Sequence, residues 1–219
     1  MLRREILSMA NITNDTSGGV TIGVDMAHYA LLTKDEKGEA PVYSEPVPLV
    51  NAKSITRNAS DSSVTEFYDN APKVTAVSKG ERSLAFVKSA FSNADRQVLL
   101  GRKKIGGITV GGGDDFAPSI AFGFRTMKSN GNYSYIWLLK GTLYENEVAA
   151  ATREANVSFQ NQTLNGTFIV RNCDNQDILQ IDTDDPDYTD AIGDAWFTAE
   201  TLNVLYDAED EGEGDEAAG

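Results

Sequence analysis

The sequence predicts a mainly β protein: an antiparallel β-sandwich or barrel with one short flanking α-helix and a long inter-strand loop. Three observations favour this class. Short apolar runs with strand-like alternation recur along the chain, Gly, Asn and Pro separate them, and helical periodicity is rare. A chain of 219 residues with 41% hydrophobic residues is large enough to bury one proper core.

Composition also suggests where the domain begins and ends. We expect the β-domain to cover residues 20–206, after an N-terminal extension formed by residues 1–19. The chain has two candidate translation starts, Met1 and Met9, so the residues before the second are expected to lie outside the fold. Residues 207–219 contain seven acids and no base, which is typical of a disordered, solvated tail.

The first strand is expected in VTIGVDMAHYALLT, residues 20–33, where alternation leads into a continuous apolar end. Further strands are expected in residues 64–70 and 73–88. Lys79-Gly80 has the composition of a hairpin tip within the second of these stretches. We expect antiparallel pairing throughout.

Two Asn-Gly pairs predict hairpins in the second half of the chain. Asn130-Gly131 divides residues 119–144 into two strands, and Gly141 predicts a further bend. Asn165-Gly166 predicts the clearest hairpin, residues 154–172, because both central positions of a type I′ turn need positive φ.

One helix is expected, in the segment FSNADRQVLLG. Ser92 is a suitable N-cap, Asp95 follows it by three residues, and Gly101 can end the helix. Val98 and Leu99 are expected to face the sheet.

The longest segment without clear periodicity covers residues 35–62 and contains Pro41, Pro46 and Pro48. Long loops in compact domains usually have a function or are disordered. We therefore expect this segment to be the long inter-strand loop.

The charge and hydropathy of the chain argue against tight DNA binding and membrane insertion. The formal net charge is -14, and half of it lies in the acidic tail, so the body is acidic as well. Tight DNA binding depends mainly on Lys and Arg that neutralise phosphates. No apolar run reaches the roughly 18 residues that suggest a membrane-spanning helix.

Little in the sequence suggests an enzyme. His28 is the only histidine, and no Gly-x-Ser-x-Gly motif accompanies it. Cys173, the single cysteine, is expected to act as a small apolar group. The glycine-rich stretch at 101–116 lacks the Lys-Ser/Thr of a phosphate loop and carries Asp114 and Asp115, so we expect it to connect strands. Paired carboxylates for glycoside hydrolysis stay open, since their separation depends on the fold.

The acidic run IDTDDPDYTD is the best candidate for a calcium site. Its carboxylates belong to Asp182, Asp184, Asp187 and Asp190. However, Pro186 and Asp187 stand where an EF-hand loop needs Asp or Asn and then Gly. We therefore expect a solvated acidic turn and assign no metal and no cofactor.

Seven stretches, read in order, resemble the major tail protein family of long non-contractile tailed phages (siphophages). They are IGVDMAHYALLTKDEKG (22–38), PVYSEPVPLVNAKSI (41–55), TEFYDNAP (65–72), ADRQVLLG (94–101), FAPSIAFGF (116–124), YIWLLKGTL (135–143) and DAWFTAE (194–200). Each stretch alone has low specificity for the family. The order of all seven over most of the chain is much more specific. Residues 1–8 and the acidic tail at 207–219 depart from the family pattern.

The resemblance implies a structural protein of the virion rather than an enzyme. In that family the subunit is a β-sandwich with a flanking helix, and six subunits form a ring whose sheets join into an inner barrel. The rings stack into a tail tube that conducts the genome, and the 35–62 segment would match the loop that reaches neighbouring subunits. Implied partners are further copies of the chain, the tape measure protein, and the tail terminator and distal tail proteins.

The same resemblance implies synthesis in the host cytoplasm, no membrane contact, and DNA that passes without tight binding. An acidic wall would repel DNA phosphates, so we expect a net negative lumen with the acidic tail outside it. The residues expected to serve packing or subunit contacts are Tyr29, Tyr43, Pro46, Tyr68, Asp69, Gly101, Pro118, Phe122, Trp137, Lys140, Gly141, Trp196 and Phe197. Most of the aromatic ones are expected to be ordinary core. One alternative stays open: a monomeric surface β-sandwich module that binds a sugar or depends on calcium.

Overall fold

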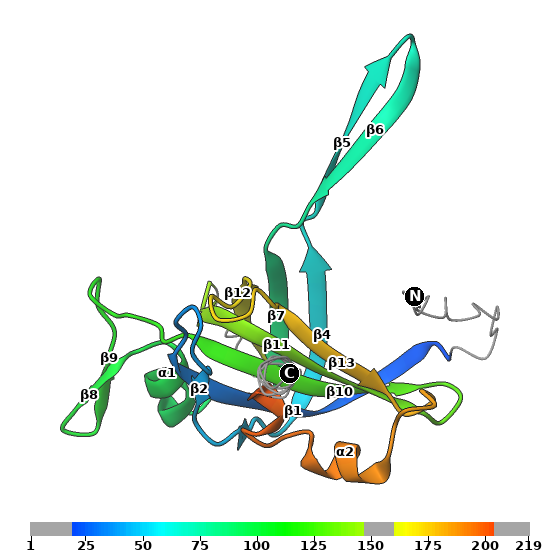
Figure 1. Cartoon of the computed structure of the whole chain (residues 1–219). Helices are drawn as coiled ribbons and strands as arrows, with labels where there is room; N and C mark the ends of the chain where they lie inside the picture. Colours follow the sequence, from blue (N-terminus) through cyan, green and yellow to red (C-terminus); the bar gives the residue numbers. More distant parts are fainter. Residues whose placement is uncertain (1–18, 147–159, 204–219) are drawn as a thin grey trace, which may run out of the picture.

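The computed structural model describes residues 19–146 and 160–203 (Figure 1). They form a nine-stranded antiparallel sheet, two two-stranded sheets, two short α-helices and one 3-10 turn. The mainly β, antiparallel class predicted from the sequence is confirmed. Within the described residues the large sheet is open and does not close into a barrel. The acidic tail and most of the N-terminal extension lie outside the described residues.

The large sheet has the order β2-β1-β10-β11-β12-β7-β4, with β3 added to β1 and β13 added to β11. Its strands are β1 (Thr21–Lys34), β2 (Val42–Tyr43), β3 (Val47–Pro48), β4 (Ala52–Ala59), β7 (Arg82–Lys88), β10 (Ile120–Lys128), β11 (Tyr133–Tyr144), β12 (Gln162–Phe168) and β13 (Ile178–Asp182). The small sheets are the hairpins β5 (Ser62–Tyr68) with β6 (Ala71–Ser78) and β8 (Lys103–Ile105) with β9 (Ile108–Val110). The helical elements are α1 (Asn93–Leu99), α2 (Asp190–Ala195) and the 3-10 turn η1 (Thr201–Asn203).

Strand β11 changes partner along one of its edges. Residues 134–138 pair with β13, whereas residues 141–144 pair with β12. On its other edge, the pairing with β10 shifts register between Ile120 and Phe122. The bend predicted at Gly141 was wrong, because β11 is continuous from Tyr133 to Tyr144; Gly141 instead lies where the strand changes partner.

The sheet carries an apolar core on each face, because successive side chains of β11 point to opposite sides. Leu138 lies in one core and Trp137 in the other, and both are fully buried. The first core also contains Phe86, Leu99, Phe122, Leu164 and Phe168, and the second contains Tyr43, Tyr135, Leu139, Trp196 and Leu202. A strand buried on both faces needs a continuous apolar run, which the segment YIWLL supplies.

The predicted helix is confirmed as α1, with the predicted cap. The Ser92 hydroxyl accepts a hydrogen bond from the Asp95 amide, and the Asp95 carboxylate accepts one from the Ser92 amide. Gly101 follows the helix with φ +67°, a conformation that favours glycine. Leu99 is buried as expected, but Val98 is exposed, so the expectation that both face the sheet was wrong for Val98.

The hairpin predicted at Asn165-Gly166 was wrong. Both residues lie inside β12, between β11 and β7, and neither has positive φ. Gly166 is required there by close packing, since a Cβ atom would come within 2.7 Å of Leu143 and 2.9 Å of Phe168. An Asn-Gly pair occurs both in tight turns and in strands where a neighbour comes too close for a side chain. The local sequence alone does not distinguish these two settings.

The structure also corrects the long loop expected at residues 35–62. That segment contains β2, β3 and β4, of which β3 pairs with β1 and β4 with β7. The segment that projects from the domain is instead the β5–β6 hairpin, residues 62–78 (Figure 1). Lys79-Gly80 is not a hairpin tip. It lies where the projecting hairpin rejoins the sheet, because β7 pairs with β4 and β12 rather than with β6.

Gly141→Ala should destabilise the fold by about 1–3 kcal/mol, the usual cost of overpacking a core. A Cβ atom at Gly141 would lie 2.4 Å from the Phe168 ring and 2.6 Å from the Thr167 carbonyl oxygen, and the backbone oxygen cannot move aside. Urea unfolding followed by Trp fluorescence measures the change. Gly112→Ala is the matched control, since its Cβ would meet open space and its stability should not change.

Candidate assembly surfaces

The main candidate for function is the β5–β6 hairpin, residues 62–78, which we call the arm. It extends away from the large sheet as a two-stranded ribbon (Figure 1). Every residue of the arm is exposed to solvent. An isolated two-stranded hairpin is at best marginally stable in water, so an arm of this kind is typical of a surface completed by a partner.

Both faces of the arm carry large apolar side chains. Residues that pair across an antiparallel ribbon share a face, which places Val64 and Val74 on one face and Phe67 on the other. Five apolar residues of the arm are between 56% and 68% exposed: Val64, Phe67, Tyr68, Val74 and Val77. This apolar surface, together with strand edges that are unpaired in the described residues, favours association with another chain.

The end of the arm is a tight turn at Asp69-Asn70. Both residues have positive φ, 51° and 60°, the combination that a type I′ hairpin turn requires. Tyr68, which precedes the turn, is exposed at the outer end of β5. Tyr68 and Asp69, chosen from the sequence as packing or contact candidates, therefore lie at the arm tip and outside the core.

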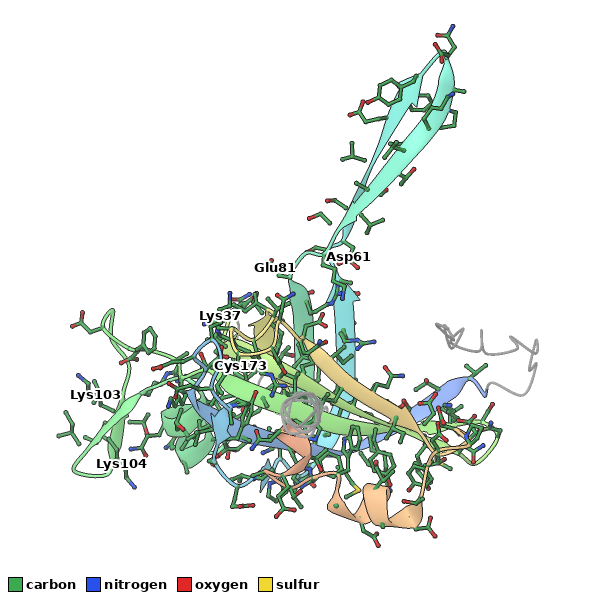
Figure 2. All side chains as sticks on the ribbon, in the orientation of Figure 1. Lys37, Asp61, Glu81, Lys103, Lys104 and Cys173 are labelled. Carbon is green, nitrogen blue, oxygen red and sulfur yellow. The ribbon has the colours of Figure 1, made fainter. Side chains whose placement is uncertain are left out.

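The base of the arm is fixed to the domain by polar contacts near Asp61 and Glu81 (Figure 2). The Ser60 amide and hydroxyl donate to the Glu81 carbonyl oxygen at 3.1 and 3.0 Å. Asp61 accepts from the Gly80 amide and from Arg82, and these two hydrogen bonds hold the pKa of Asp61 below its usual value. Because Arg82 also donates to Asp177 in the loop before β13, the arm is joined to two parts of the sheet.

A second, smaller hairpin also projects from the domain. The glycine-rich stretch forms β8 and β9, with positive φ at Gly106 and Gly107 in the turn between them. This hairpin exposes the apolar side chains Ile105, Ile108 and Val110, and Lys103 and Lys104 extend from β8 (Figure 2). The stretch expected to connect strands is thus a hairpin in its own right, and it adds exposed apolar surface beside α1.

Most of the other residues chosen from the sequence are packing residues. Phe122 and Trp137 are fully buried. Trp137 Nε1 donates to the Trp196 carbonyl oxygen at 2.9 Å, and its ring packs against Phe197. Buried, or partly buried at the edge of the domain, are Tyr29, Tyr43, Pro46, Gly101, Pro118, Lys140, Gly141, Trp196 and Phe197.

Lys140 has a specific structural role, because it closes an ion pair with Asp35 in the loop after β1. Its Nζ lies 2.6 Å from Asp35 Oδ2, and the Asn172 and Cys173 amides donate to the same carboxylate at 2.8 and 3.0 Å. Burial raises the pKa of Asp35, but these hydrogen bonds lower it by more, so the pKa lies below its usual value. The pair holds the β1 end against the 171–175 loop.

Asp35→Asn should therefore lower stability at pH 7 by about 1–3 kcal/mol, the range for hydrogen bonds to a charged group. Because the folded-state pKa is depressed, the stabilising effect is present above the unfolded pKa of about 3.9 and is lost as pH falls through the folded value. Urea unfolding of wild type and variant should converge at acidic pH. Asp114→Asn, at an exposed site, should have the same free energy of unfolding as wild type at every pH. If the stability difference between wild type and Asp35→Asn were the same at low pH as at pH 7, this account would be contradicted.

Arg171 is a buried residue that the sequence reading missed. It is 1% exposed and forms an ion pair with Asp174. It also donates to the Leu202 carbonyl oxygen at 2.6 Å and to the Tyr43 hydroxyl at 3.3 Å. Burial raises the pKa of Tyr43 to about 12. The segment RNCDN has the composition of a surface turn, and nothing local in it signals a buried cation.

His28 and the acidic run both have partners within the domain. Burial lowers the pKa of His28, whose ring stacks on Phe197 at 4.2 Å and whose Nδ1 lies 2.8 Å from the Met26 carbonyl oxygen. Lys128 Nζ binds Asp182 and Asp184 at 2.8 and 2.9 Å, so two carboxylates of the acidic run are paired with a lysine. No group of three or more potential metal ligands occurs within the described ranges 19–146 and 160–203. No helix in the part of the chain that the structure describes is long and apolar enough to cross a membrane.

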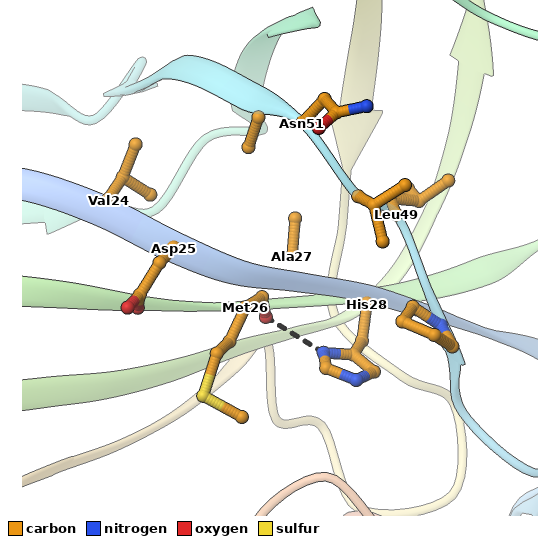
Figure 3. Close-up of a pocket in the computed structure, with 10 residues that line it drawn as sticks. Val24, Asp25, Met26, Ala27, His28, Leu49 and Asn51 are labelled. Atoms are coloured by element: carbon orange, nitrogen blue, oxygen red, sulfur yellow. Dashed lines mark hydrogen bonds between the residues drawn. The ribbon is translucent and has the colours of Figure 1, made fainter.

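A groove of about 480 Å³ lies between residues 24–28 of β1 and the 48–52 segment (Figure 3). Figure 3 shows Val24, Ala27 and Leu49 on the same side of β1, and Met26 and His28 on the other side. We call the space between β1 and the 48–52 segment the β1 groove.

Comparison of the sequence with protein-family models and with curated proteins gave no match in either case.

Proposed function

We propose that the protein is a structural subunit of a phage tail tube, which forms hexameric rings that stack into a hollow tube for the genome. The observation that carries this proposal is the arm, a projecting ribbon with exposed apolar residues on both faces and a base held by hydrogen bonds. Exposure of Phe67 and Val74 does not stabilise a monomer, whereas in an assembly both side chains would be buried. The resemblance of the sequence to major tail proteins supplies the identity of the assembly.

The large sheet supports the same proposal through its edges. Among the described strands, β4 and β13 each have one edge with no strand partner. Such edges are an aggregation hazard in a monomer, and pairing them between subunits removes the hazard. In the proposed ring, sheets of neighbouring subunits join at these edges, and the sandwich architecture of a tail-tube subunit is part of the proposal.

The arm takes the role that the sequence reading gave to the 35–62 segment. In the proposed tube it reaches a neighbouring subunit, and repetition of such a contact between unlike surfaces extends a filament. The acidic body suits a wall that DNA slides past, and we propose a net negative lumen. The proposed location is the tail tube of the virion, assembled in the host cytoplasm with tape measure, tail terminator and distal tail proteins.

Negative-stain electron microscopy of the purified protein over a wide concentration range tests the proposal. We expect hollow tubes of uniform diameter or six-fold rings, together with no tight DNA binding at physiological salt. Monomers at the highest concentrations, or solid fibres without a lumen, would contradict it. A monomer would then be assayed for sugar and calcium binding, the alternative function considered from the sequence.

A further inference from the structure

We propose that the β1 groove is the receptor for the arm tip of a second copy of the chain. This inference rests on the proposed function for the existence of an assembly, and it adds the surface on which the arm docks. Phe67 would enter the groove beside residues 24–26 and 50–52, and Tyr68, on the opposite face of the ribbon, would lie at its rim. The contact is heterologous, because the arm tip and the groove are different parts of the chain.

The groove has an apolar part because a β-bulge changes the alternation of β1. The pairing with β10 shifts between Asp25 and His28, and Met26 in the bulge has φ +49°. Figure 3 shows Ala27 rather than Met26 on the side of Val24. A small side chain thus faces the 48–52 segment, and beyond the backbone hydrogen bond between Leu49 and Ala27 no strand pairing joins residues 24–26 to residues 50–52 in the described structure. Bulges commonly redirect side chains in this way beside binding sites.

The residues of the groove provide an apolar floor and an exposed wall. Ala27 and Leu49 are 2% and 3% exposed and form the floor, where the Leu49 amide donates to the Ala27 carbonyl oxygen at 2.7 Å. Val50 is 63% exposed and stands at the opening. The lining also includes three polar residues: Asn51, which has positive φ, His28, and Asp25, which forms an ion pair with Arg125 at 2.7 Å. An aromatic side chain that enters an apolar hollow of this kind is the usual anchor of a protein interface.

The arm of the same molecule cannot fill its own groove. Strand β4 begins at Ala52, beside the groove, and the chain continues through β4 and β5 to the tip at Tyr68. Sixteen extended residues span roughly 50 Å at about 3.3 Å per residue. Figure 1 shows that β4 and the arm both lead away from β1, and the hydrogen bonds at Asp61 and Ser60 hold that direction. This geometry excludes the arm of the same molecule, whereas the arm of a second copy can reach the groove.

Charges beside the two surfaces are complementary. Glu66, next to Phe67, is exposed and is the acid available to the groove, whereas Asp69 forms an ion pair with Lys73 at 3.9 Å. Lys53, exposed and next to the groove residue Ala52, forms none of the ion pairs found in the described residues. Opposite charges at the rim of an interface favour the correct orientation of encounter.

The test mixes two variants that each lack one half of the contact. Phe67→Ser/Tyr68→Ser keeps the groove and removes the aromatic side chains of the arm tip. Val50→Glu keeps the arm tip and places a charge at the groove. All three positions are exposed, so both variants should fold like wild type by circular dichroism and thermal melting. Each variant alone should lose arm-mediated association, while the mixture should form a one-to-one dimer by sedimentation velocity.

Three controls make the result decisive. Val98→Glu places the same charge at an exposed valine of α1 and should associate like wild type. Lys53→Glu should weaken the dimer by roughly threefold or more, and Glu66→Lys on the arm partner should restore it. If Val50→Glu assembled as well as wild type, or if the mixture stayed monomeric, the inference would be overturned.

The outcomes for the groove and for the tail tube are distinguishable. Tubes that form normally from Val50→Glu would overturn the groove inference and leave the proposed function intact. A one-to-one dimer from the mixture, with no tube or ring from wild type, would support the groove contact and contradict the tail tube.

Discussion

Replacement of residues 62–78 by an Asn-Gly turn is expected to abolish self-assembly and to leave a folded monomer. The arm contributes no buried residue to either core, so the melting temperature should shift by no more than about 2 °C. Ser62 and Ser78 pair at the arm base, so a two-residue turn can join Asp61 to Lys79 without strain on the sheet. Sedimentation velocity and electron microscopy measure the loss of assembly, and thermal melting measures the fold.

The matched control for this deletion keeps the arm and changes its polar residues alone. Thr65→Ser/Thr75→Ser alters a cross-strand hydroxyl pair on the arm and leaves all five large apolar side chains in place. It should assemble like wild type. An arm deletion that still formed tubes would show that the sheet edges are sufficient, and the arm would then not be the main assembly surface.

Arg171→Met is expected to destabilise the fold by about 3–5 kcal/mol, because it leaves the buried Asp174 carboxylate without its cation. The same change removes the donors to the Tyr43 hydroxyl and the Leu202 carbonyl oxygen. Urea unfolding followed by circular dichroism measures the change. Arg57→Met, at an exposed position of β4, is the control and should change stability by less than about 0.5 kcal/mol.

The double variant Arg171→Met/Asp174→Leu separates two explanations of that loss. If the cost arises from an unpaired buried charge, removal of both charges should recover a large part of the stability. If the cost arises from lost packing around Arg171, the double variant should be no more stable than the single one. We expect recovery, because the pair lies in the core beside Tyr43 and Leu202 rather than at the surface.

The parts of the fold that the sequence predicts are those fixed by local chemistry. The capping box at Ser92 and the glycine that follows the helix are local signals, and α1 formed where they placed it. The alternation and apolar end of residues 20–33 correspond to β1, and Asn130-Gly131 lies in the turn between β10 and β11. Each of these features depends on residues within one turn or one strand.

The parts that the sequence did not predict depend on contacts between distant segments. Asn165-Gly166 lies in β12 because β7 and β11 flank it, and neither neighbour is visible in the local pattern. Arg171 is buried by Tyr43 and Leu202, residues from opposite ends of the domain. For the candidate site, the sequence placed Tyr68 and Asp69 among the packing or contact candidates, and the structure places them at the arm tip, but the sequence assigned the projection to residues 35–62.

The uneven charge of the molecule has a consequence for the kinetics of assembly. The arm carries one formal negative charge of the -14 on the chain, so almost all of the charge lies elsewhere. Two approaching subunits therefore repel each other at long range and attract only when the apolar arm makes contact. The Debye length falls from about 30 Å at 0.01 M salt to about 10 Å at 0.1 M. Growth should accelerate as ionic strength rises, so that dilute buffer would store the subunit as a monomer and added salt alone would start polymerisation.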